Sequence, residues 1–131
     1  MEYVLPCHRA FGVLAFGRSS SLLQSTWAKL DQQLTNCRTH IYTAQAKALS
    51  GNDNDQMHES AISHRFQLRA EAIDLAARCT HAAVIVSKGA ANLLDHPAQR
   101  VYREALAFSV FGQTNAVMDA SLSRLAQFAH K

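Results

Sequence analysis

Seven histidines are the residues of this chain with the widest chemical use, because histidine titrates near neutrality and ligates metals. His58 and Glu59, followed by His64, resemble a helical zinc-binding box in composition. Such a box needs its two histidines four residues apart, so that both imidazoles share one helix face. Here they are six apart, and we therefore expect no zinc site. His40, His81 and the other histidines are expected on helix surfaces or between helices.

Three cysteines, Cys7, Cys37 and Cys79, are well separated and form no Cys-x-x-Cys pair. Cysteines without metal-binding spacing, and odd in number, favour free thiols in a reducing compartment. Free cysteine behaves as a small apolar side chain. We therefore expect all three in the protein core and not in a catalytic or metal site.

The carboxylates also lack the spacing that metal or acid–base chemistry requires. Di-metal helical bundles use Glu-x-x-His on facing helices, whereas Glu71 and Glu104 are followed at that distance by Asp74 and Ala107. The sequence contains no Gly-x-Ser-x-Gly nucleophile turn and no phosphate-binding glycine loop. Both glutamates are expected on the surface, and the residues alone predict neither a metal site nor a catalytic group.

Composition and charge exclude several classes of protein. The chain has 131 residues, 48% of them hydrophobic, and a formal net charge of +3. Its cations alternate with acids, which is typical of solvated helix surfaces and not of a nucleic-acid interface. No apolar run reaches the roughly 20 residues of a membrane span, and the first residues do not resemble a signal peptide. We expect a cytoplasmic protein without nucleic-acid or membrane partners.

Helical periodicity dominates the whole sequence and predicts the elements that position these residues. Apolar side chains recur at intervals of three and four, and there are only two prolines and five glycines. We expect one domain over residues 1–131, an all-α four-helix bundle. Its helices are expected at residues 7–34, 37–49, 59–94 and 97–128.

Four breaks separate or weaken these helices. Thr35 and Asn36 mark the first, and the turn residues of 50–55 mark the second. At the third, Asp95 or His96 is expected to cap a helix that Pro97 opens. Residues 112–115, Gly-Gln-Thr-Asn, are poor helix formers and predict an interruption of the last helix.

The segment from His96 to Thr114 resembles the last-helix sequence of the acyl-CoA dehydrogenase family. In that family a proline and an Arg-Asp-Ala run open the final helix, and a kinked Tyr-Glu-Gly-Thr segment follows. Here residues 103–105 read Arg-Glu-Ala and residues 111–114 read Phe-Gly-Gln-Thr. The order of the expected helices is also similar to the C-terminal helical-bundle domain of these flavoproteins.

This resemblance implies an FAD contact at Gln113, Thr114 and Asn115, where an interrupted helix would offer backbone amides to the nucleotide. A different interpretation of the same segment is a polar kink that bonds to its own backbone. Many family members place the catalytic glutamate in the kink. The matching residue here is Gly112, which has no side chain, so we expect no catalytic residue in this chain.

Other family features are missing. The Arg-x-x-Phe run that follows the family's first helix is absent, and the Gly-Gly pair before its last helix is reduced to Gly89 and Ala90. The 131 residues also contain no segment that resembles the family's N-terminal helical or middle β-domain. The resemblance thus implies part or a relic of an FAD-dependent oxidoreductase acting on acyl thioesters, inactive without its missing domains. The alternative is a non-catalytic helical module that forms homo-oligomers.

Overall fold

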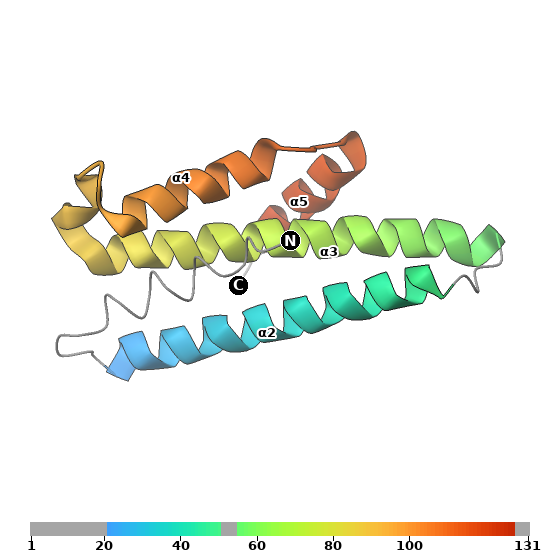
Figure 1. Ribbon diagram of the computed structural model, residues 1–131, viewed down its shortest axis with the longest axis horizontal. Coiled ribbons are helices and arrows are strands. Elements are labelled where there is room, and N and C mark those ends of the chain that lie inside the picture. Colours follow the sequence, from blue (N-terminus) through green and yellow to red (C-terminus); the bar gives the residue numbers. More distant parts are fainter. Residues whose placement is uncertain (1–20, 51–54, 128–131) are drawn as a thin grey trace. The chain divides into compact units, whose positions relative to one another are not determined.

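The computed structural model describes residues 21–50 and 55–127 (Figure 1). Within these ranges every regular element is a helix and no strand occurs. The expectation of an all-α chain is therefore confirmed. The elements, in order, are α2 (Ser21–Leu49), α3 (Asp55–Ser87), the short 3-10 helix η1 (Lys88–Asn92), α4 (Pro97–Val110) and α5 (Asn115–Gln127).

Contacts divide the chain into two units. Among the described residues, unit 1 contains 21–30 and 75–112, and unit 2 contains 31–50, 55–74 and 113–127. Each unit therefore holds one part of α2, one part of α3 and one C-terminal helix. The single domain expected over residues 1–131 stays a prediction.

Helix α2 runs without interruption through the first expected break. Gln32 donates a side-chain hydrogen bond to Asn36 (2.9 Å), and the Thr39 hydroxyl donates to the Thr35 carbonyl (3.0 Å). These bonds lie within one turn and satisfy polar side chains that would otherwise favour a break. The predicted end at residue 34 is wrong, and residues 7–20 of the expected first helix lie outside the described ranges.

Helix α3 ends seven residues earlier than expected. The predicted helix over 59–94 becomes an α-helix up to Ser87 followed by η1. Lys88 has a left-handed backbone, with φ of 53°. An L-residue continues a right-handed helix poorly from this conformation, so the expectation that the helix passes Gly89 is wrong.

The last expected helix, 97–128, is two helices. α4 begins at Pro97, as predicted, and ends at Val110, and α5 begins at Asn115. The interruption predicted at 112–115 is present, shifted by one residue to Phe111–Thr114. Residue 128 lies outside the described part of the chain.

The core of unit 1 contains small side chains. Ala83 of α3, Ala91 of η1 and Ala98 of α4 are buried in one cluster, and Leu23 and Trp27 of α2 pack against it. Alanine has no side chain beyond Cβ, so three helical segments come close together at this point. Figure 1 shows α4 returning alongside the second half of α3, within this unit.

The buried side chains of α3 do not form a single stripe. Ile73 and Thr80 are buried, whereas Ala77 is exposed. Leu75 and Cys79 are among the most deeply buried side chains. In unit 1, α3 is contacted by both α2 and α4, so its buried surface covers more than one face.

Candidate functional site

The segment with the strongest functional prediction lies at the junction of α4 and α5. Gln113, Thr114 and Asn115 are all exposed. The backbone N–H of Val117 donates to the Thr114 hydroxyl (3.3 Å), and the N–H of Met118 donates to the Thr114 carbonyl (2.9 Å). Thr114 is therefore an N-cap of α5. These bonds correspond to the alternative interpretation, a polar kink bonded to its own backbone.

Gly112 has a structural reason to be glycine. Its φ is 62°, in the left-handed region that glycine enters at little cost. The residue follows α4 and redirects the backbone toward α5. Any side chain beyond hydrogen at this position would need a strained backbone.

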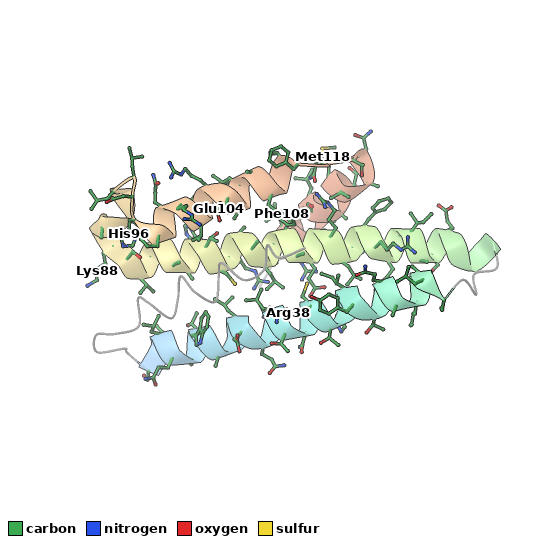
Figure 2. All side chains as sticks on the ribbon, viewed as in Figure 1. Arg38, Lys88, His96, Glu104, Phe108 and Met118 are labelled. Carbon is green, nitrogen blue, oxygen red and sulfur yellow. The ribbon has the colours of Figure 1, made fainter. Side chains whose placement is uncertain are left out.

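Glu71 and Glu104 were both expected on the surface, and Glu104 lies there. Arg100 donates to its carboxylate (2.9 Å), and both side chains are largely exposed. An exposed pair of this kind contributes little to stability. Glu104 is labelled in Figure 2, on α4.

Glu71 belongs to a partly buried polar cluster of unit 2, which we call the ionic cluster: Cys37, Glu71, Asp74 and Arg124. Arg124 of α5 donates through Nε to Asp74 Oδ2 (3.4 Å), and its guanidinium lies 3.9 Å from Glu71 Oε1. Only 8% of the Asp74 side chain is exposed. The cluster therefore joins α5 to α3 by charge, in a site partly removed from water.

Cys37 of α2 completes the ionic cluster. Burial raises the pKa of its thiol from 9.0 to about 11, the negative charge of Glu71 adds to the rise, and the positive charge of Arg124 opposes it. A thiol with this pKa is protonated at neutral pH, and the thiolate is the nucleophilic form. Cys37 is accordingly a buried, unreactive thiol, as expected for the cysteines.

The other cysteines and the histidines add no chemical site to the described part of the chain. Cys79 is a buried thiol in unit 1 that forms no disulfide, and Cys7 lies outside the described residues. His96 accepts a hydrogen bond at Nδ1 from the N–H of Ala98 (3.2 Å) and caps α4. Between residues 21 and 127, leaving out 51–54, no three His, Cys, Asp or Glu side chains are grouped to hold a metal ion.

Sequence reasoning missed the ionic cluster and placed Glu71 on the surface. Two signals were present. Glu71 and Asp74 are three residues apart and so share one face of α3. Arg124 lies seven residues after Val117 and four residues after Ala120, so it shares the buried side of α5 with both.

The exposed side of α5 carries an apolar stripe: Met118, Leu122 and Leu125, with exposed fractions of 41%, 57% and 60%. Their spacing of four and three residues places them on one face of the helix. Val117 and Ala120, on another face, are buried. Helix α5 is therefore apolar on the side that packs within unit 2 and also on a side that faces solvent. Met118, at the start of the stripe, is labelled in Figure 2.

None of the described helices combines the length and the apolar character needed to cross a bilayer. Comparison of the chain with protein-family models, with curated proteins and with solved structures finds no match in any of the three.

Proposed function

We propose that this chain is a non-catalytic helical interaction module that assembles with a second copy of itself through α5. The proposal rests on the α5 stripe of Met118, Leu122 and Leu125. This stripe is exposed, whereas Val117 and Ala120 on the other side of the helix are buried. Apolar side chains gathered on one solvent-facing stripe favour association. The stripe contains no charge, so two copies can pair across a two-fold axis without repulsion.

Three groups that could take part in chemistry have structural surroundings that fit this proposal. Cys37 is buried and protonated at neutral pH, and Glu104 is paired on the surface. The polar residues of the α4–α5 junction form the cap of α5. The proposal also retains the bundle prediction: the four α-helices would pack as a bundle whose outer stripe forms the contact between copies.

Light scattering of the purified chain over a range of micromolar concentrations tests self-association directly. We expect a dimer whose population rises with concentration. Leu122→Lys introduces a charge at the centre of the stripe and should weaken association at least about tenfold. Ser123→Lys adds the same charge at an exposed neighbouring position off the stripe and should leave association unchanged. A wild-type chain that stays monomeric throughout would contradict the proposal.

The second candidate is a helical domain related to the acyl-CoA dehydrogenase-like flavoproteins, with Gln113, Thr114 and Asn115 near an FAD molecule. It is supported by the helix interruption at Phe111–Thr114, where the resemblance implies one, and by the exposure of these three side chains. Titration of the chain with FAD, followed by flavin fluorescence, separates the candidates. Saturable quenching that Thr114→Ala weakens would favour the flavoprotein. Unchanged fluorescence, together with a colourless protein, would remove it.

A further inference from the structure

We draw no further inference here: the strongest candidate, the exposed apolar turn of residues 93–94 between η1 and α4 in unit 1, has a hydrogen bond from Arg103 to its Leu94 carbonyl, and nothing in the described residues shows what covers it.

Discussion

The two buried polar residues Thr80, in unit 1, and Asp74, in unit 2, form their hydrogen bonds in opposite ways. In unit 1 the hydroxyl of Thr80 donates to the carbonyls of Ala76 and Ala77 on its own helix (2.8 and 3.1 Å). In unit 2 the carboxylate of Asp74 is bound by Arg124, 50 residues later in the chain. The Thr80 bonds therefore stay within one helix, whereas the bond between Asp74 and Arg124 connects two helices.

The contacts between helices also differ between the two units. Unit 1 brings helices together through Ala83, Ala91 and Ala98, which add no polar group that needs a partner. Unit 2 places a thiol and three charged groups where its helices meet. The stability of unit 1 should thus depend on the volume of its buried side chains. The stability of unit 2 should depend on the charges of the ionic cluster and on pH.

Arg124→Ala should produce the largest loss. It removes the cation that binds Asp74 and leaves a nearly buried carboxylate without its α5 partner. Removing this cation from the partly buried pair should cost about 3 kcal/mol, because the Asp74 carboxylate stays largely desolvated while it loses the bond to α5. Urea denaturation followed by circular dichroism measures the change. The matched control is Arg103→Ala, an exposed arginine with one long hydrogen bond to the Leu94 carbonyl, and it should cost less than about 0.5 kcal/mol. Equal losses for both variants would contradict the account of unit 2.

Ala98→Leu should destabilise unit 1 by about 2.5 kcal/mol. Ala98 is completely buried within the alanine cluster, and extra methylene groups in a filled core force the surrounding helices apart. Trp27, the only tryptophan of the chain, packs against this cluster, so its emission reports the change.

The control for this variant is Ala77→Leu, at an exposed position of α3 in the same unit. It should change stability by no more than about 0.5 kcal/mol. If Ala98→Leu were equally neutral, the close approach of η1, α3 and α4 would not limit side-chain volume.

The pKa of Cys37 predicts a loss of stability in base. Its pKa in the folded chain is raised to about 11 from 9.0, so its contribution is fully present below pH 9 and is lost as the pH rises to 11. Across this window the contribution amounts to about 2 kcal/mol. Cys37→Ala should be less stable near neutrality because a side chain is missing, but its stability should fall less between pH 9 and 11 than that of the wild type. If the stabilities of both proteins fell equally between pH 9 and 11, Cys37 would not be the source of this pH dependence.

The cap of α4 should give the smallest effect. His96→Ala removes the acceptor of the Ala98 N–H and should cost about 1 kcal/mol. His96→Asp supplies another side-chain acceptor at the same position and should restore most of this loss. If both variants were equally destabilised, the hydrogen bond to Ala98 would not be the reason for the loss.

Local signals predicted the all-helical fold and the start of α4, because a cap residue before proline acts within one turn. The interruption near Gly112 was predicted as well, because the weak helix propensity of residues 112–115 is also a local property. The uninterrupted course of α2 was not predicted. There the Asn36 side chain accepts a bond from Gln32 and the Thr35 carbonyl accepts one from the Thr39 hydroxyl, each one turn away, and these bonds offset the weak helix propensity of residues 35 and 36. The left-handed backbone of Lys88 could not be predicted, because lysine has no preference for this conformation.

The candidate site was less predictable than the fold. Thr114 was predicted to lie at a polar kink, and its hydrogen bonds agree with the interpretation in which the kink binds its own backbone. The ionic cluster depends on Arg124 reaching α3 from 50 residues away. Periodicity shows that Arg124 shares a side of α5 with Val117 and Ala120, but not which helix that side meets. The exposure of the apolar stripe of α5 could not be predicted either, because helical spacing does not distinguish a buried stripe from an exposed one.

The most direct test of the contrast between the units is the rate at which a thiol reagent labels Cys37 in native buffer, with Cys7→Ser and Cys79→Ala in the background. If the ionic cluster holds α5 over Cys37, Arg124→Ala should raise this rate about a hundredfold, which corresponds to about 2.7 kcal/mol of opening free energy. The emission of Trp27 in unit 1 should stay unchanged. An unchanged labelling rate, or a shift of Trp27 emission that accompanies faster labelling, would contradict the account.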